Sequence, residues 1–139
     1  MEDTYINKND NFFIPYNVPS SKNSKQIVWK DMGGGKKRPL IIDSKTTRNY
    51  KKNTKKIYQL LAKQFRSIVD SLPKPVTIEF TFIRGSKRKF DYINPAQTVQ
   101  DIMVEHEWIE DDDCNNIIPA FQPYQYNKEQ PGVIIKIIK

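Results

Sequence analysis

The sequence predicts a single α/β (α+β) domain in which a mixed β-sheet carries its helices mainly on one face. Val76 to Ile83 alternates β-branched or aromatic residues with polar ones, which is typical of a strand. Apolar residues recur every three or four positions between Ile57 and Leu72, which is typical of an amphipathic helix. The 139 residues contain no repeat and no dividing linker, so residues 1–139 are expected to form one domain.

The N-terminal third is expected to form strands and turns. Asn11 to Val18 reads as a first strand, and Pro15 confines it to a sheet edge or to a bulge. The segments expected after it are a polar turn (19–25), a short strand (27–29), a flexible glycine-rich loop (32–37) and a returning strand (38–43).

A long basic helix is predicted from Ser44 onward. Asp43 or Ser44 is a suitable N-cap, and Pro73 ends the helix. The apolar face is predicted to consist of Ile57, Leu61, Phe65, Ile68 and Leu72. The other sides carry Lys45, Arg48, Lys51, Lys52, Lys55, Lys56, Lys63 and Arg66 with almost no acids between them, a pattern that favours phosphate binding over a merely solvated surface.

The second half continues with a strand, a helix and two more strands. After the strand at 76–83, a basic turn (84–90) leads to Asp91. Asn94 is expected to cap a helix in which Pro95 is the first residue and which runs through His106. Trp108 and Ile109 are expected to anchor the chain in the core, and the final strands are expected at 117–121 and 132–138.

The charges are arranged in blocks. Residues 36–90 contain sixteen Lys or Arg against three acids, whereas residues 91–113 contain eight acids and no Lys or Arg. A basic block of this kind indicates a polyanionic partner, held through phosphate contacts and counterion release. The acidic block requires neutralisation, for which a divalent cation is one candidate.

Several other classes of protein are not indicated. Cys114 is the single cysteine and His106 the single histidine, so neither a disulfide nor a zinc site at the usual spacing is expected. The Gly33–Gly35 run lacks the spacing of a phosphate-binding loop. Neither a signal peptide pattern nor a membrane-length apolar run is present, so we expect a cytoplasmic protein with no membrane partner.

The carboxylates of the acidic block suggest metal chemistry. Asp91 follows a strand directly, and Asp111, Asp112 and Asp113 follow the next helix, so folding can bring the two groups together. Asp101 lies on the same helix face as Gln97. Converging carboxylates on Mg²⁺ or Mn²⁺ are what a phosphodiesterase uses to polarise a phosphate and activate water.

Residues 87–113, KRKFDYINPAQTVQDIMVEHEWIEDDD, resemble the central motif of the RusA-type Holliday-junction resolvases. Residues 18–24 (VPSSKNS) are similar to the opening of that family, and 132–138 (GVIIKII) suits its last strand. The resemblance implies a RusA-like mixed sheet and a homodimer that cleaves four-way DNA junctions with magnesium in recombination and repair.

Carried over by residue, the resemblance implies that Asp91, Asp101, Asp111 and Asp112 are catalytic. It makes Asp91, Asp112 and Asp111 the metal ligands, and it assigns motif support to Asn94 and Gln97. Two positions depart from the family pattern, because Ile93 stands where a second aspartate is expected and Gln97 where a lysine is expected. Glu110 or Asp113 are candidates to replace the missing ligand.

The expected DNA contacts are the basic residues that flank this motif, namely Lys22, Lys45, Arg48, Lys52, Lys87, Arg88 and Lys89. Three functions stay open. The first is a magnesium-dependent endodeoxyribonuclease acting on branched DNA. The second is a junction- or duplex-binding protein of the same fold with impaired catalysis, which Ile93 and Gln97 suggest. The third is an interaction protein whose basic surface meets RNA or an acidic protein.

Overall fold

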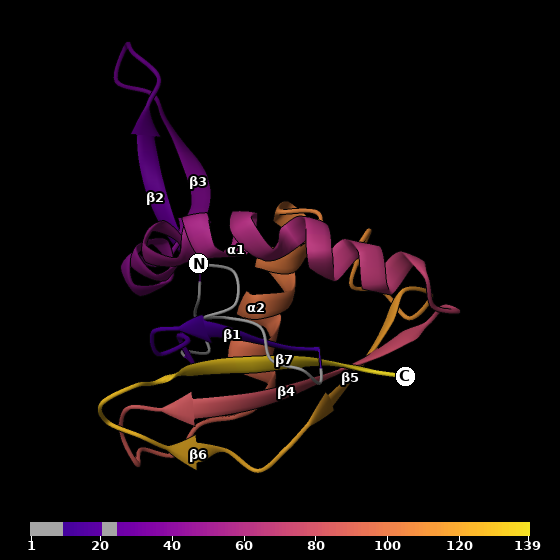
Figure 1. Ribbon diagram of the computed structural model, residues 1–139. Coiled ribbons are helices and arrows are strands. Elements are labelled where there is room, and N and C mark those ends of the chain that lie inside the picture. The colour runs from indigo at the N-terminus through magenta and orange to yellow at the C-terminus, as the bar shows by residue number, and fades with distance from the viewer. Residues whose placement is uncertain (1–9, 21–24) are drawn as a thin grey trace.

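The computed structural model describes residues 10–20 and 25–139, residue 25 through its backbone alone. Both helices lie on one face of a mixed sheet, and a two-stranded ribbon projects away from them (Figure 1). The elements are β1 (Asn11–Pro15), β2 (Lys25–Asp31), β3 (Lys37–Asp43), α1 (Lys45–Asp70), β4 (Val76–Arg84), α2 (Ile93–Glu105), β5 (Ile117–Phe121), β6 (Gln125–Tyr126) and β7 (Gly132–Ile138).

The main sheet has the strand order β1–β7–β4–β5, and the short β6 pairs with the end of β4. β7 is antiparallel to both of its neighbours, whereas β5 and β6 run parallel to β4. A parallel pair cannot be joined by a hairpin, so the chain crosses over between β4 and β5 through α2. The predicted mixed α+β sheet is confirmed.

β1 is shorter than the predicted strand at 11–18. Tyr16 has a φ of 77°, which turns the chain out of the extended conformation directly after Pro15. β1 lies at the edge of the sheet, as the proline predicts, because an edge strand does not need a donor at every position.

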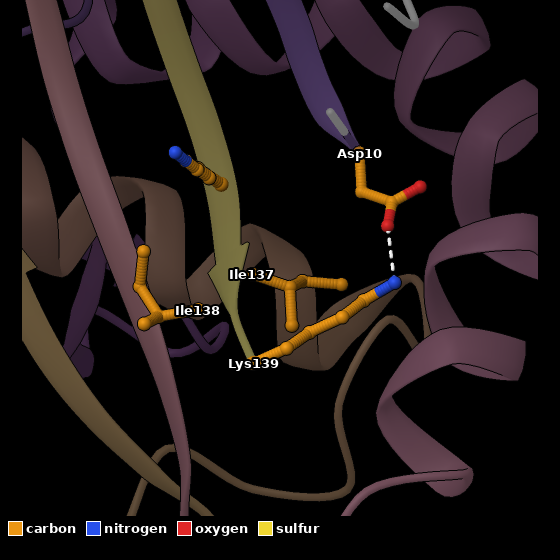
Figure 2. A pocket seen from close by; sticks show the side chains of 5 residues that line it. Asp10, Ile137, Ile138 and Lys139 are labelled. Carbon is orange, nitrogen blue, oxygen red and sulfur yellow. Dashed lines mark ion pairs between the residues drawn. The ribbon is translucent and has the colours of Figure 1, made fainter. Parts of the chain in front are cut away.

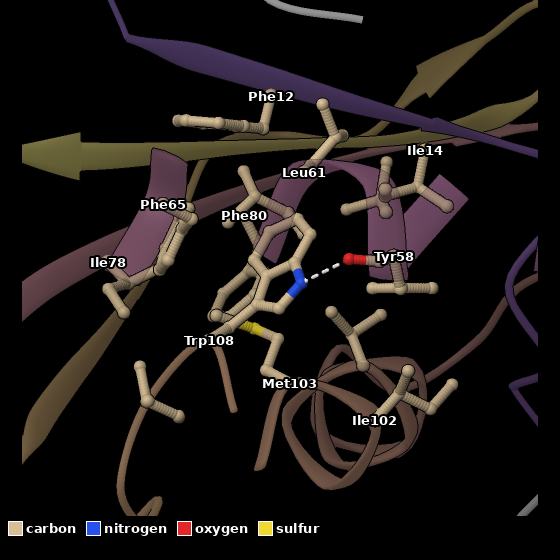
Figure 3. Close-up of a cluster of buried hydrophobic side chains, with 14 of the residues drawn as sticks. Phe12, Ile14, Tyr58, Leu61, Phe65, Ile78, Phe80, Ile102, Met103 and Trp108 are labelled. Carbon is tan, nitrogen blue, oxygen red and sulfur yellow. Dashed lines mark hydrogen bonds between the residues drawn. The ribbon is translucent and has the colours of Figure 1, made fainter. Parts of the chain in front are cut away.

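The core lies between the sheet and the two helices and is centred on Trp108 (Figure 3). The Trp108 ring centroid lies 4.5 Å from that of Phe65 on α1 and 5.8 Å from that of Phe12 on β1. Its indole Nε1–H donates a 2.7 Å hydrogen bond to the carbonyl oxygen of Tyr58, which satisfies the one polar group of this buried side chain. The predicted anchor at Trp108 and Ile109 is confirmed, since both side chains are buried.

α1 begins where the sequence predicts, with Ser44 as the N-cap whose side chain accepts a hydrogen bond from the Thr47 N–H. Its buried residues are Thr47, Tyr50, Thr54, Tyr58, Leu61, Phe65 and Val69. The predicted apolar face is therefore right at Leu61 and Phe65, whereas Ile57, Ile68 and Leu72 are only partly buried at its margin. The face is rotated because the hydroxyls of Tyr50 and Tyr58 bond each other at 3.0 Å, which allows both phenols to be buried.

α2 begins at Ile93, so the prediction that Asn94 caps this helix is wrong. The Asn94 N–H already donates to the carbonyl of Asp91 at 3.1 Å, which places Asn94 inside the first turn. Tyr92 occupies the N-cap position without a side-chain cap bond. The tyrosine hydroxyl instead accepts a hydrogen bond from the Tyr124 N–H at 2.9 Å and is thereby held against the segment between β5 and β6. His106 is the C-cap, which agrees with the predicted helix end.

β2 and β3 pair only with each other and form a ribbon separate from the main sheet. Both are longer than predicted at the turn end, and the residues between them include Gly33, Gly34 and Gly35, all with positive φ. Within the described ranges, neither helix has a stretch that is long and apolar enough to cross a membrane.

Candidate functional site

Two cavities are lined by the first turn of α2, and several predicted site residues belong to them. Ile93 lines one cavity and its neighbour Asn94 lines the other. We call them the Asp112 cavity and the Asp91 cavity after the carboxylate that each contains.

The Asp112 cavity has a volume of about 350 Å³ and is lined by residues of α2, β5 and the segment between them. Its polar groups are the Asp112 carboxylate and the carboxamides of Gln97 and Gln100, and its apolar lining includes Ile93 and Phe121. Ile93 and Gln97, the two positions that depart from the RusA-type motif, thus share one cavity with Asp112.

The Asp91 cavity is more polar and has a volume of about 400 Å³. It is lined by Ser20, Lys89, Phe90, Asp91 and Asn94. A cation, a carboxylate, a hydroxyl and a carboxamide therefore line the same cavity. The cation, the Lys89 ammonium group, can neutralise a phosphate.

Arg84 fixes the segment that carries Ser20 beside this cavity. Its guanidinium donates to the carbonyl of Val18 at 2.6 Å and to Oγ of Ser20 at 2.9 Å, and it lies 4.6 Å from the centroid of the Phe90 ring. Burial lowers the pKa of Arg84 from its ordinary value. The sequence reasoning missed this residue, although its position gave a signal, because Arg84 continues the buried alternation of β4 that runs from Val76 to Phe82.

The acids after Trp108 form a short exposed cluster with different local roles. Oδ1 of Asp111 accepts a 2.8 Å hydrogen bond from the backbone N–H of Asp112. Oδ1 of Asp113 accepts from Asn115 and Asn116 and closes the turn that enters β5. Partial burial raises the pKa of Asp112, as do the hydrogen bond with the Asp111 side chain and the charges of Asp111 and Asp113.

The structure brings only some of the predicted acids together. Asp91 and Asp112 line different cavities, and Asp101 lies on the exposed side of α2 and lines neither. Over residues 10–20 and 25–139, no three side chains of the His, Cys, Asp and Glu types are arranged so that they could hold a metal ion. Asp113, a candidate to replace the missing ligand, is engaged in its turn.

These donors fit a magnesium ion of a particular kind. Mg²⁺ keeps several waters and is commonly held by one or two carboxylates together with substrate phosphates. Asp112 and the amide oxygens of Gln97 and Gln100 match that requirement, and no lysine or arginine of the described chain forms an ion pair with Asp111, Asp112 or Asp113. One carboxylate and two carboxamides could thus hold such an ion only together with water and phosphate oxygens, and not as protein ligands alone.

The predicted phosphate contacts lie on two surfaces. Lys45, Arg48 and Lys52 are exposed on the first turns of α1, where the Arg48 guanidinium donates to the carbonyl of Asp43 at 2.7 Å. Lys87, Arg88 and Lys89 are exposed in the loop before Asp91, and the Lys87 ammonium lies 5.1 Å from the centroid of the Tyr126 ring. Lys22 lies outside the described residues.

Two further hollows among the described residues contain none of the predicted site residues. One of about 380 Å³ lies at the end of β7, where Lys139 forms an ion pair with Asp10 (Figure 2). Another of about 530 Å³ is lined by α1 residues and by His106, whose ring stacks on Tyr58. Cys114 is exposed and free.

Comparison with known proteins does not extend the resemblance. No protein-family model matches the chain, and no curated protein is significantly similar to it. The function is therefore argued from the two cavities and the basic surfaces beside them.

Proposed function

We propose that the protein is a magnesium-dependent endodeoxyribonuclease that acts on branched DNA, such as the four-way junctions of recombination and repair. The observation that carries the proposal is the shared cavity of Asp112, Gln97 and Ile93. Ile93 and Gln97 lie four residues apart on α2 and Asp112 lies in the segment after this helix, and in a RusA-like fold these three positions of the motif are expected at one active site.

In this proposal two residues of the Asp91 cavity bind the phosphate, and those of the Asp112 cavity bind the metal ion. The Lys89 ammonium binds a non-bridging oxygen of the scissile phosphodiester, and the Asn94 carboxamide donates a second hydrogen bond to it. Asp112 would hold the magnesium ion together with the carboxamides of Gln97 and Gln100. Asp91 would be the second carboxylate ligand that the resemblance implies. When bound, the ion polarises the phosphate and lowers the pKa of the attacking water.

The basic surfaces would hold the arms of the substrate. Lys45, Arg48 and Lys52 on α1 and Lys87 and Arg88 on the 85–89 loop are exposed cations, so they can neutralise phosphates on both sides of the cleaved bond. Cleavage of a four-way junction by two symmetric nicks needs two copies of the site, and we therefore propose that a homodimer is the active form.

The test is a nicking assay on a synthetic four-way junction with Mg²⁺ or Mn²⁺. The unmodified protein is expected to nick the junction, whereas Asp91→Asn and Asp112→Asn are expected to bind it without cutting. Glu129→Gln, on the exposed loop before β7, is the matched control and should nick normally. Absence of nicking by the unmodified protein, or nicking by both aspartate variants at the rate of the unmodified protein, would refute the catalytic proposal.

A second function, binding of branched or duplex DNA without cleavage, is favoured by one specific observation. The side chain of Ile93 is 69% exposed and lies at the position where the family motif has a carboxylate, so that side of the Asp112 cavity is apolar. This function predicts salt-sensitive junction binding that is unchanged in EDTA, together with no nicking at any magnesium concentration.

A further inference from the structure

The β2–β3 ribbon exposes an apolar face that no described part of the molecule covers. The strand register pairs Ile27 with Ile41 and Trp29 with Pro39, so these four side chains lie on the same face. Ile27 and Trp29 are each 65% exposed and Ile41 is 74% exposed. An isolated two-stranded ribbon is marginally stable in water, and a contiguous exposed apolar patch indicates a binding surface.

The charges on the ribbon indicate which partner covers this face. Lys30 and Arg38 form a cross-strand pair of exposed cations on the opposite face, and Lys36 and Lys37 lie at the tip. None of these four forms an ion pair with a described residue. The cations are therefore available to an anionic partner.

The two acids of the ribbon do not offset these cations. Asp31 accepts a 2.8 Å hydrogen bond from the Gly33 N–H and closes the tip, and Asp43 pairs with Lys51 of α1 at 2.7 Å. The combination of free cations with an exposed aromatic ring matches nucleic acid, in which phosphates alternate with stackable bases.

The shape of the ribbon also suits this partner. Gly33, Gly34 and Gly35 have positive φ, and no atom lies within 4 Å of the position that a Cβ would occupy at any of them. The tip is therefore surrounded by open space and accessible to a partner, and a two-stranded ribbon is one of the few elements that fit a DNA groove.

The ribbon is continuous with the basic start of α1. β3 ends at Asp43, whose carbonyl accepts from Arg48, and exposed Lys45 and Lys52 follow. Exposed cations thus lie at the ribbon tip and again on the first turns of α1, with residues 39–44 between the two groups.

We propose that the ribbon is a nucleic-acid-binding arm in which Trp29 stacks on an unpaired base at a DNA branch point. Ile27 and Ile41 pack beside that base, while Lys30, Lys36, Lys37 and Arg38 bind the flanking phosphates. The inference rests on the proposed function, in which DNA is the partner. It specifies which part of the DNA the ribbon recognises, namely an unpaired base at the branch point.

Tryptophan fluorescence tests the stacking directly, because the chain has two tryptophans and Trp108 is fully buried. A four-way junction added in EDTA is expected to quench the exposed Trp29, and unbranched duplex of the same length is expected to quench it less. Trp29→Phe, which leaves only Trp108, should show no quenching. Junction binding without any change in emission would overturn the inference.

Three substitutions of Trp29 separate base stacking from apolar packing. Trp29→Ala and Trp29→Leu are both expected to weaken junction binding about tenfold, since neither has a π face, whereas Trp29→Phe should retain most of the affinity. Ile118→Ala on β5, also at an exposed apolar residue, is the matched control and should bind as the unmodified protein does.

The possible failures are distinguishable. If Trp29→Leu binds like Trp29→Phe, the face binds DNA by apolar packing and the stacking inference is overturned. If Trp29→Ala changes the oligomeric state without changing DNA affinity, a second copy covers the face and the inference is likewise overturned. All binding is measured without magnesium, so a protein that binds through Trp29 but never nicks refutes only the nuclease proposal. If nicking is normal and Trp29→Ala has no effect on junction binding, only the inference fails.

Discussion

The guanidinium of Arg84, at the end of β4, donates a 2.9 Å hydrogen bond to the hydroxyl of Ser20, which lies 64 positions away in the sequence. The same group holds the carbonyl of Val18 at 2.6 Å. The buried Arg84 thus joins the end of β4 to the segment after β1. Ser20 of that segment lines the Asp91 cavity, so one side of the cavity depends on this hydrogen bond.

Replacing Arg84 with methionine is expected to lower the free energy of unfolding by about 2 kcal/mol, because the buried carbonyl of Val18 loses its donor. Urea denaturation measures this loss. Arg88→Met is the control, since Arg88 is exposed, and it should leave the unfolding midpoint unchanged. An unchanged midpoint for Arg84→Met would show that water replaces the guanidinium at no cost.

Ile93→Asp is expected to strengthen magnesium binding in the presence of junction DNA. The new carboxylate would lie in the same cavity as Asp112, and because Ile93 is exposed the fold should tolerate the change. We expect half-maximal nicking at a magnesium concentration lower by about tenfold or more, since even supporting groups of a metal site change its affinity by that factor.

The double variant Ile93→Asp/Gln97→Lys separates the two functions proposed above. Cleavage gained by this variant over an inert parent would favour the binding function for the natural chain. An active parent and a faster variant would favour the nuclease.

Lys45→Gln, Arg48→Gln and Lys52→Gln are expected to weaken junction binding to a similar degree on all sequences. Each should reduce the slope of log affinity against log salt by about one, because each removes one phosphate contact. The slope comes from fluorescence-anisotropy titrations at several salt concentrations. Lys128→Gln, on an exposed loop distant from α1 in the sequence, should leave the slope unchanged, and an equal reduction there would indicate a general charge effect.

The buried pair Tyr50 and Tyr58 predicts a loss of stability in alkali. Burial raises the pKa of both phenols above the ordinary value of 10.0. The folded state therefore keeps protons that the unfolded state releases, so this contribution to stability is complete below pH 10 and falls as the pH rises above it. Absorbance at 295 nm should show these two tyrosines ionising only as the protein unfolds.

A phenylalanine substitution checks the hydrogen bond between the two hydroxyls. Tyr50→Phe leaves the Tyr58 hydroxyl buried without its 3.0 Å partner and is expected to cost about 1 kcal/mol of unfolding free energy. Tyr16→Phe, at an exposed tyrosine, is the matched control. Equal stability of the two variants at pH 7 would contradict the assignment.

The periodic elements were predictable because their patterns are local. The alternation from Val76 to Ile83 gave β4, and Ser44 gave the N-cap of α1. Asn94 misled the prediction, because the Asn94 N–H donates to the Asp91 carbonyl and the helix therefore starts two residues earlier, at Ile93. The rotation of the α1 face was not predictable, since it depends on a bond between Tyr50 and Tyr58 within the fold.

The candidate site was predictable in part. The motif indicated the region of α2 and the acids after it, but Asp112 shares its cavity with Gln97 and Asp91 lines a second one, because Ile93 and Asn94 on the first turn of α2 line different cavities. Arg84 was missed because a charged residue at the end of a strand is ordinarily solvated, and only the distant Val18 and Ser20 explain its burial.

None of residues 25–43 belongs to the hydrophobic core. The ribbon can therefore be lengthened, shortened or exchanged without uncovering the interior of the domain. Selection can act on its tip while the rest of the protein is held constant, so a lineage of such proteins could diverge in target choice through this appendage alone.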